Sequence, residues 1–395
     1  RTKRITKRIT KRITKRITKR RTNRRTNRRT RSRRITQKGG GGGVPLLILD
    51  LTAAHTDSVT SLAWCPWWSL LATGSNDKTV KLWRFSDDGK RAKCTATLEG
   101  HDGPITSLAF HPTEPLLATS SGRGSSDGAP PGTVKLWYLS ANLTDAICVA
   151  TLEGEEELDF FISVAFHPRL PLLATSTNNN TVKLWLLEYA VIKDEKLDTT
   201  IRRGYGSHPL EFKSATPAAT LVGHRNLVNC LAFHPTEPLL VTGSYDSTMR
   251  WWRFSDDGSG AEEVKDLWVA ADGVHSVAFH PTKPLLATGG ADNIVKLWYL
   301  SDTLTDVTYV ATLEGHSGWV ASVAFHPTEP LLATGSWDNT AKLWSYSSDG
   351  QSATCVATLT HNDDAVASVA FDPTKHWLAT GCRDNTVKLY ELYSR

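Results

Sequence analysis

The sequence is poor in the features that mark membrane proteins, disulfide-bonded proteins and metal sites. No apolar run approaches the ~20 residues that span a bilayer, and the longest, VPLLILDLTAA, is interrupted by Asp50. The six cysteines include no C-x-x-C pair, so the sequence indicates neither a zinc site nor a disulfide framework, and we expect buried, reduced thiols. The only methionine is Met249 and the chain starts at Arg1, so a targeting segment removed before Arg1 stays an open alternative.

Signatures of catalysis and of cofactor binding are missing as well. The glycine-rich RGSSDG has neither the GxxxxGK[ST] nor the GxGxxG pattern that holds phosphates, and the acidic EGEEELD lacks the spacing of a calcium loop. Five histidines recur in the motif FHP, but they fall one per repeat, which is too far apart for shared metal ligation. We therefore predict no enzyme, no cofactor and no metal. The histidines that we interpret as turn residues are His111, His167, His234, His280 and His326.

Acidic residues are absent from the first 38 positions. This stretch holds 20 Lys or Arg, whereas the rest of the 395-residue chain has 26 basic and 40 acidic residues. The overall net charge of +6 therefore conceals an acidic body of net charge −14 joined to a basic arm. Such an asymmetry favours contact between the arm and a polyanion.

The rest of the chain is one unit repeated seven times. The clearest copy is GHSGWVASVAFHPTEPLLATGSWDNTAKLW, residues 315–344. A fixed period of this length predicts a repeat architecture. The aromatic residues that end the first segment of each copy are spaced by 46, 56, 67, 46, 46 and 46 residues, so two intervals carry insertions. These seven residues are Trp64, Phe110, Phe166, Phe233, Phe279, Phe325 and Phe371.

Each unit has the pattern of four short antiparallel strands. SVAF, LLAT and TVKLW are apolar or alternating runs, HPTEP and GSxDN are turn sequences, and a fourth run such as ATLEGH precedes each unit. Four such strands make one propeller blade. With these motifs the chain resembles the WD-repeat β-propeller family over residues 44–395, which implies an all-β, seven-bladed propeller. Because the last unit has no fourth strand behind it, we expect residues 46–52 to close the seventh blade and remove an exposed sheet edge.

The resemblance also implies a hydrogen-bonded chain of Trp, Ser or Thr, His and Asp in each blade. The indole, the hydroxyl and the imidazole can pass donor and acceptor roles along such a chain. Since the sets recur in several blades, we interpret them as structural locks and not as catalytic groups. Three blades match at every position, with His55, Thr73, Asp77 and Trp83, with His224, Thr242, Asp246 and Trp252, and with His316, Thr334, Asp338 and Trp344.

Four blades depart from this pattern. The second keeps His101, but its turn is expanded by GRGSSDGAPPG. The third has Glu155 and Asn179 where His and Asp are expected. The fifth has Ala270 at the His position, and the seventh ends in Tyr390 instead of Trp.

In the family resembled, partners bind the loops around the His and the Asp of each blade. The residue before the turn Asp varies here while its surroundings do not, and Trp, Tyr and Arg are the residue types that dominate binding at interfaces. The alternative is that these side chains only cover the loop backbone. The candidate partner-binding residues are Arg225, Tyr245, Trp319, Trp337 and Arg383.

The arm, residues 1–38, repeats KRIT four times and continues with Arg-rich units. Like charges four residues apart and β-branched side chains disfavour a helix, so we expect disorder in isolation, followed by a flexible glycine linker at residues 39–43. Regular Lys/Arg pairs suit phosphates, whereas the absence of aromatic residues argues against base stacking. An acidic protein surface, an anionic lipid and a solvated tail without a partner stay open. The candidate polyanion-binding residues are Lys3, Arg4, Lys7, Arg8, Lys11, Arg12, Lys15, Arg16, Arg24, Arg25, Arg28 and Arg29.

These observations predict an interaction scaffold that is not an enzyme. Its propeller would dock protein partners, and its arm would bind RNA or DNA within a large assembly. Two alternatives remain: a component of a particle shell whose arm threads between protein neighbours, and an adaptor that presents substrates to a separate enzyme. We expect an intracellular location, cytoplasmic or nuclear, in a ribonucleoprotein or a virion, with no membrane span.

Overall fold

The computed structural model describes residues 45–123, 130–140, 143, 145–154, 159–191, 210–255, 258–301, 306–361 and 364–392. The basic arm, the glycine linker, Glu155 and most of the expanded turn of the second blade lie outside these ranges. Every regular element within them is a β-strand. None of the described residues forms a helix long and apolar enough to cross a membrane.

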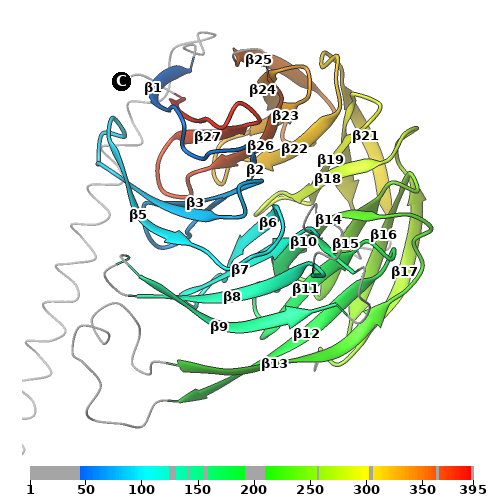
Figure 1. The fold of residues 1–395 in the computed structure, drawn as a ribbon. Coiled ribbons are helices and arrows are strands. Elements are labelled where there is room, and N and C mark those ends of the chain that lie inside the picture. The colour runs from blue at the N-terminus through cyan, green and yellow to red at the C-terminus, as the bar shows by residue number, and fades with distance from the viewer. Residues whose placement is uncertain are drawn as a thin grey trace, which may run out of the picture. The chain divides into compact units, whose positions relative to one another are not determined.

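The strands form seven four-stranded antiparallel sheets (Figure 1). Six sheets take their strands in sequence order, from β2-β3-β4-β5 to β22-β23-β24-β25. The seventh has the order β1-β28-β27-β26, so it combines both ends of the described chain, and Figure 1 shows the blue β1 beside the red C-terminal strands. The predicted all-β propeller of seven blades is confirmed.

Each strand position recurs in every blade. The first strands are β2 (Val59–Trp64), β6 (Ile105–Phe110), β10 (Phe161–Phe166), β14 (Val228–Phe233), β18 (Val274–Phe279), β22 (Val320–Phe325) and β26 (Val366–Phe371). The second are β3 (Leu70–Ser75), β7 (Leu116–Ser121), β11 (Leu172–Thr177), β15 (Leu239–Ser244), β19 (Leu285–Gly290), β23 (Leu331–Ser336) and β27 (Trp377–Cys382). The third are β4 (Val80–Phe85), β8 (Thr133–Leu139), β12 (Val182–Val191), β16 (Thr248–Phe254), β20 (Val295–Leu300), β24 (Thr340–Tyr346) and β28 (Val387–Glu391). The outermost are β5 (Ala92–Leu98), β9 (Ala146–Glu153), β13 (Leu210–Leu221), β17 (Ala261–Trp268), β21 (Val307–Leu313), β25 (Ala353–Thr360) and β1 (Leu46–Leu51).

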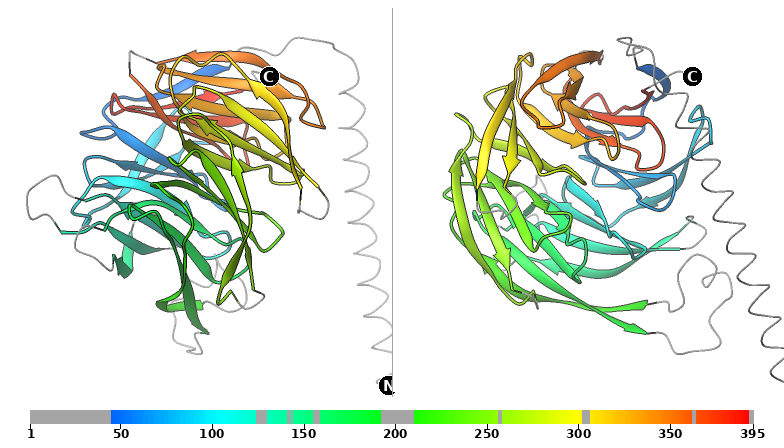
Figure 2. Two further views of the ribbon diagram at one scale, coloured as in Figure 1. Left: turned by 90° about the vertical axis from the view of Figure 1, so that its right-hand side faces the viewer. Right: turned by 180° about the vertical axis from the view of Figure 1, so that it is seen from behind.

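The first strands make the inner ring of the propeller. Each one lies against the first strand of the next blade, from β2 and β6 round to β26 and β2, so the ring is closed. Figure 2 shows the blades from two further sides, with the outermost strands at the periphery. This arrangement leaves only the outermost strand of each blade with an open edge.

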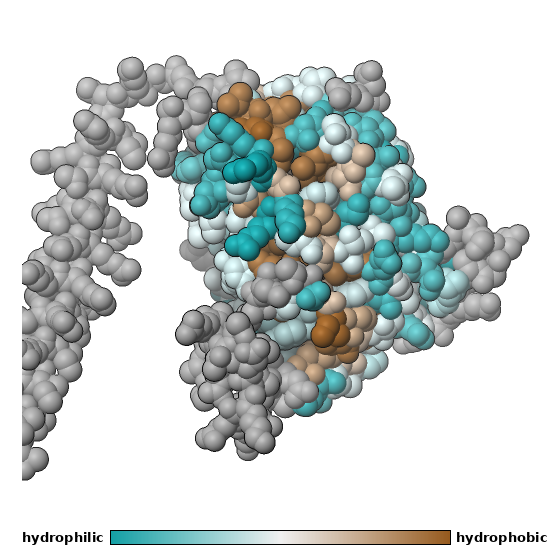
Figure 3. Space-filling view, turned by 60° about the vertical axis from the view of Figure 1, so that its left-hand side comes forward, coloured by the Kyte–Doolittle hydropathy of each residue, from teal (hydrophilic) through white to brown (hydrophobic). Residues whose placement is uncertain are grey.

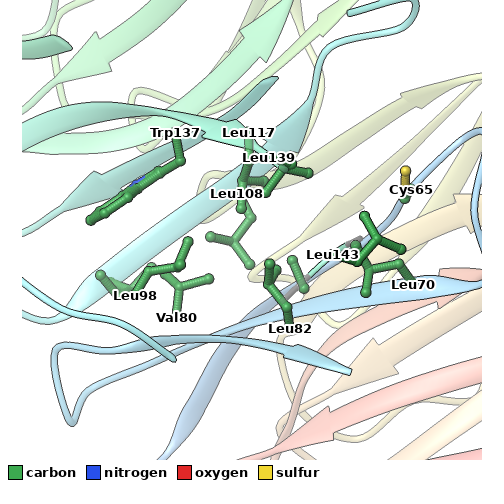
Figure 4. Close-up of a cluster of buried hydrophobic side chains, with 12 residues drawn as sticks. Cys65, Leu70, Val80, Leu82, Leu98, Leu108, Leu117, Trp137, Leu139 and Leu143 are labelled. Atoms are coloured by element: carbon green, nitrogen blue, oxygen red, sulfur yellow. The ribbon is translucent and has the colours of Figure 1, made fainter. Parts of the chain in front are cut away.

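The core lies between neighbouring blades. Each second strand, such as LLATGS in β3, is buried along its whole length because a neighbouring blade covers each face. Figure 4 shows one such layer, in which Leu70 and Leu82 of the first blade face Leu108 and Leu139 of the second. The blades approach so closely that a Cβ on Gly74 would lie 2.5 Å from a methyl carbon of Ile105. A side chain on Gly74 would therefore displace Ile105, whereas the second and third blades accommodate Ser120 and Ser176 at this position.

The prediction of buried cysteines is correct for Cys65, Cys230 and Cys382 and wrong for the other three. Cys94 is half-buried, and Cys148 and Cys355 are exposed. The exposed pair lies on the outermost strands β9 and β25, where alternate side chains face solvent.

Hydrophobic side chains are also exposed on the outermost strands. Ile147 of β9 is 69% exposed, and Figure 3 shows separate hydrophobic patches on the side where β5 and β9 lie.

Candidate functional site: the loop face of the propeller

The loop before each first strand and the loop between the second and third strands lie at the same end of a blade, because all strands are antiparallel. The first loop carries the His of the repeat and the second carries its turn Asp. The residue after this Asp takes a left-handed conformation, such as Asn339 with φ 65°, which asparagine tolerates better than most residues. We call the end of the propeller formed by these two sets of loops the loop face.

In the sixth blade the four lock residues form one chain of hydrogen bonds. The indole Nε1–H of Trp344 donates to Thr334 Oγ1 (3.0 Å), and this hydroxyl lies 2.7 Å from His316 Nε2. His316 Nδ1 lies 2.7 Å from Asp338 Oδ2. Because a carboxylate only accepts, Nδ1 carries the proton and Nε2 accepts from the threonine hydroxyl. The donor roles therefore run in one direction, from indole to carboxylate.

The first and fourth blades repeat this geometry. His55 Nε2 lies 2.7 Å from Thr73 Oγ1, and its Nδ1 lies 2.9 Å from Asp77. In the fourth blade the His224 contacts are 2.7 Å to Thr242 and 2.8 Å to Asp246. The indoles of Trp83 and Trp252 each donate to their threonine at 3.0 Å.

Burial and hydrogen bonding set the charges of these residues. Burial lowers the pKa of His55, although the charge and hydrogen bond of Asp77 act in the opposite direction, so the imidazole is neutral at pH 7. Burial raises the pKa of Asp77, but hydrogen bonds from Thr79 and the N–H of Thr56, with the nearby His55, outweigh it and bring that pKa to about 2. The pair is therefore a neutral imidazole that donates to a carboxylate.

In the second and third blades the hydrogen bonds at the lock involve other residues. In the second, His101 Nε2 contacts Thr119 (2.7 Å) and Nδ1 contacts Thr133 (2.9 Å). In the third, the Nδ2–H of Asn179 donates to Asp159 Oδ1 (3.5 Å), and Lys183 Nζ lies 3.9 Å from the other oxygen of this buried carboxylate.

The fifth and seventh blades use residues that the sequence analysis did not single out. Beside Ala270, Lys296 Nζ donates to the carbonyl of Val269 and lies 3.4 Å from Asp292. In the seventh, His361 Nε2 contacts Thr380 (2.8 Å), but Nδ1 donates to a backbone carbonyl and not to the turn Asp. His361 and Thr380 are 19 residues apart, where the complete locks have 18, and that extra residue is the signal in the sequence.

The FHP histidines lie at the opposite end of the blades. His111 Nδ1 accepts from the backbone N–H of Thr113 (3.2 Å) and of Glu114 (2.9 Å), and it therefore shapes the turn. The same pattern holds at His326, where the N–H groups of Thr328 and Glu329 donate to Nδ1. Within the described residues no group of three or more His, Cys, Asp or Glu could hold a metal ion.

Four of the five candidate partner-binding residues lie in one row across the loop face. The ring of Trp319 lies against that of Trp337, with centroids 4.7 Å apart, and Arg383 Cζ lies 4.1 Å from the Trp337 centroid. His275 extends the row: it stacks on Trp319 at 5.2 Å and meets the ring of Tyr245 edge-on at 5.0 Å. We call these five residues the aromatic row.

The aromatic row crosses four blades. Tyr245 belongs to the fourth blade, His275 to the fifth, Trp319 and Trp337 to the sixth, and Arg383 to the seventh. Trp319 is 38% exposed and Trp337 40% exposed. The sequence analysis missed His275, although it is the only histidine at its position among the seven first strands. The fifth candidate, Arg225, is exposed on the loop beside that of Tyr245.

The backbone of each loop in the row is fixed to its neighbour. The N–H of Trp337 donates to the carbonyl of Trp319 (2.9 Å), and the N–H of Arg383 donates to that of Ala365 (3.0 Å). The hydroxyl of Ser58, in the first blade, donates to the carbonyl of Arg383 (3.0 Å). The row is therefore held in place by the frame of the propeller.

Comparison with known proteins gives partial matches to several of them. The chain is 28% identical to Striatin-4 of Mus musculus over 220 residues, 56% of this chain and 24% of that protein. It is 25% identical to Pre-mRNA-processing factor 19 homolog 2 of Arabidopsis thaliana over 204 residues, 52% of this chain and 32% of the relative. It is 29% identical to WD repeat-containing protein 37 of Xenopus tropicalis over 203 residues, 47% and 37% of the two chains. Each match therefore spans well under half of the relative's length.

The family comparison covers every blade. The family described as WD domain, G-beta repeat matches seven segments, at residues 45–84, 92–137, 146–185, 215–253, 265–299, 307–345 and 353–391. Each segment contains the second strand of one blade, the turn that follows it and at least the beginning of the third strand. These matches cover more than half of the chain, and it belongs to the WD domain, G-beta repeat family.

Proposed function

We propose that the protein is an interaction scaffold without enzymatic activity, whose loop face docks protein partners and whose basic arm holds RNA or DNA within an assembly. Membership in the WD domain family supports a protein-interaction scaffold. The observation that carries the docking part is the aromatic row. Two tryptophans and an arginine, the residue types that dominate interface energies, lie exposed and adjacent on this face.

The arm supplies the second contact of the scaffold. Its 20 basic residues against none acidic give a strong attraction to phosphates that does not depend on base sequence. One relative is by its name a pre-mRNA-processing factor, which supports RNA as the polyanion. On this proposal the protein works inside the cell, in a nucleoprotein assembly.

One capture experiment tests both contacts. The full chain is used to capture binding partners from cell extract, with and without nuclease treatment. We expect two sets of partners. Those held through the arm are lost after nuclease treatment or after deletion of residues 3–18, which carry four Lys and four Arg. Those docked on the loop face survive nuclease and are lost when Trp337→Ala is combined with Tyr245→Ala.

The controls separate binding from folding and from the shell alternative. The double variant should melt within a few degrees of the unaltered chain, because both side chains lie in loops and Trp337 is 40% exposed. Replacing the four Ile of residues 3–18 by Ala should leave nuclease-sensitive capture unchanged, whereas a shell component would lose its protein neighbours. The proposal fails if the double variant and the deletion each retain all partners.

A further inference from the structure

The faces of the two tryptophan rings in the aromatic row are already occupied. Trp337 lies between Trp319 and the guanidinium of Arg383, and Trp319 lies between Trp337 and His275. A base or a flat cofactor would need a free ring face for stacking. Since 38–40% of each tryptophan is nevertheless exposed, the row presents ring edges to a partner.

Edges and faces of aromatic rings differ in charge. The face of a ring is electron-rich and its edge carries partial positive charge. The indole N–H groups of Trp319 and Trp337 also donate to no acceptor among the residues that the structure describes. A row of edges with two free N–H donors therefore attracts oxygen acceptors and aliphatic side chains.

Arg383 adds a full positive charge at one end of the row. Its planar guanidinium can stack on Trp337 while its N–H groups, which lie in the guanidinium plane, stay available for a carboxylate. Arg383 is exposed, and it has no carboxylate within ion-pair distance in the described part of the chain. The turn carboxylate that follows it, Asp384, accepts from the N–H and the hydroxyl of Thr386 instead.

The other end of the row has exposed charges of both signs nearby. Arg225 is exposed on the loop beside that of Tyr245, and Asp272 is exposed on the loop that precedes the first strand of the fifth blade. Arg383 is the member of the row that carries a full positive charge and stacks on a tryptophan, so we place the anionic group of the partner there.

We infer that the aromatic row is a docking site for an acidic peptide segment of a partner protein, with a carboxylate on Arg383 and aliphatic side chains against the edges of Trp337 and Trp319. This inference rests on the proposed docking role of the loop face and adds the chemistry of the partner. The fixed loop backbones lower the entropy lost on binding, because the row does not need to be ordered first.

The test uses the full chain with all 20 Lys and Arg of residues 1–38 replaced by Gln, so that the arm does not compete for an acidic probe. Two fluorescein-labelled peptides are compared by anisotropy, one of alternating Leu and Glu and one of alternating Leu and Gln. We expect the Glu peptide to bind about tenfold more tightly, the size expected for one charge-assisted hydrogen-bonded pair. The intrinsic tryptophan emission should change on binding.

Three variants locate the site. Arg383→Gln should abolish the preference for the Glu peptide, and Trp337→Ala should lower the affinity for both peptides. Arg84→Gln is the matched control, because Arg84 is also an exposed arginine but lies at the other end of its blade, and it should change neither affinity. All three variants should melt with the parent chain.

Several results would overturn the inference. Equal affinity for the two peptides overturns the inference, as does a preference that survives Arg383→Gln. Tighter binding of a thymidine dodecamer, lost in Arg383→Gln, would assign the row to single-stranded nucleic acid and also overturn it. If neither peptide binds but the capture of partners still depends on Trp337 and Tyr245, this inference is wrong and the proposed docking function stands.

Discussion

At the scale of single residues, the same turn carboxylate serves different networks in different blades. Asp338 accepts from His316, from the N–H of Ser317 and from Thr340, and so joins three segments of the sixth blade. Asp384 occupies the matching position of the seventh blade, where among the described residues it accepts from Thr386 alone. The shared position therefore does not imply a shared energetic contribution.

This difference predicts unequal effects of the same substitution. Asp338→Ala should lower the free energy of unfolding by roughly 1–3 kcal/mol, because the buried His316 loses its acceptor. Asp384→Ala should cost clearly less, since no imidazole depends on it. Urea unfolding of the two variants measures both losses. Equal losses would show that the link between His and Asp does not stabilise the blade.

At the scale of elements, the sequence predicted most of what is repeated. The alternation of TVKLW and the turns typified by HPTEP and GSxDN recur with variations in all seven repeats, so local propensity and repeat spacing specify the same blade in each copy. The complete locks could also be found by position, because the distance from His to Thr is 18 residues in each of them.

What the sequence did not predict depends on contacts between blades or on single departures from the repeat. The aromatic row needs His275 and Trp319, which come from different blades and meet only once the ring is closed. In the fifth blade Lys296 takes the place beside Asp292 that a His would fill, and its position in the third strand gives no local sign of this role.

The strand β1 (Leu46–Leu51) completes the seventh blade from the other end of the chain. It pairs with β28, and Ile48, Leu49 and Leu51 pack on a core cluster that includes Trp377. Without it, β28 would be an open and partly apolar edge.

Two truncations test this closure. Deletion of residues 1–53 removes β1 and about 3 kcal/mol of apolar packing, counted at about 1 kcal/mol for each half-buried aliphatic side chain. We expect its melting temperature to fall by about 5 °C or more. Deletion of residues 1–43 is the control, because it leaves β1 intact and should melt with the full chain. Equal melting temperatures for the two truncations would contradict the role of β1.

At the scale of the whole molecule, a second ring of contacts joins the blades at the end opposite the loop face. Each FHP histidine lies against the aromatic residue that ends the first strand of the following blade, with centroids 4.9–5.1 Å apart. His111, for example, meets Phe166 at 4.9 Å. Burial lowers the pKa to about 4 in four of the five: His111, His167, His280 and His326.

These lowered pKa values predict a loss of stability in mild acid. Well above pH 6.5 the histidines are neutral in both the folded and the unfolded chain, so stability is at its full value. As pH falls from 6.5 towards 4, the unfolded chain takes up protons that the folded chain does not, and stability decreases. Each histidine contributes at most about 1.4 kcal/mol per pH unit to this slope. Urea unfolding between pH 7 and pH 4.5 measures it, and a flat profile would contradict the prediction.

One substitution separates the proton effect from packing, because the seventh blade already shows an alternative. There Asp372 stands in the histidine position, and its Oδ1 accepts from the N–H groups of Thr374 and Lys375. In His326→Asn the amide oxygen can accept from the same turn, but the side chain no longer titrates or fills the space beside Phe371. We therefore expect lower stability at every pH together with a slope reduced by up to about 1.4 kcal/mol per pH unit. If the two profiles run parallel, His326 shapes the turn without contributing to acid sensitivity, and the prediction is wrong for this histidine.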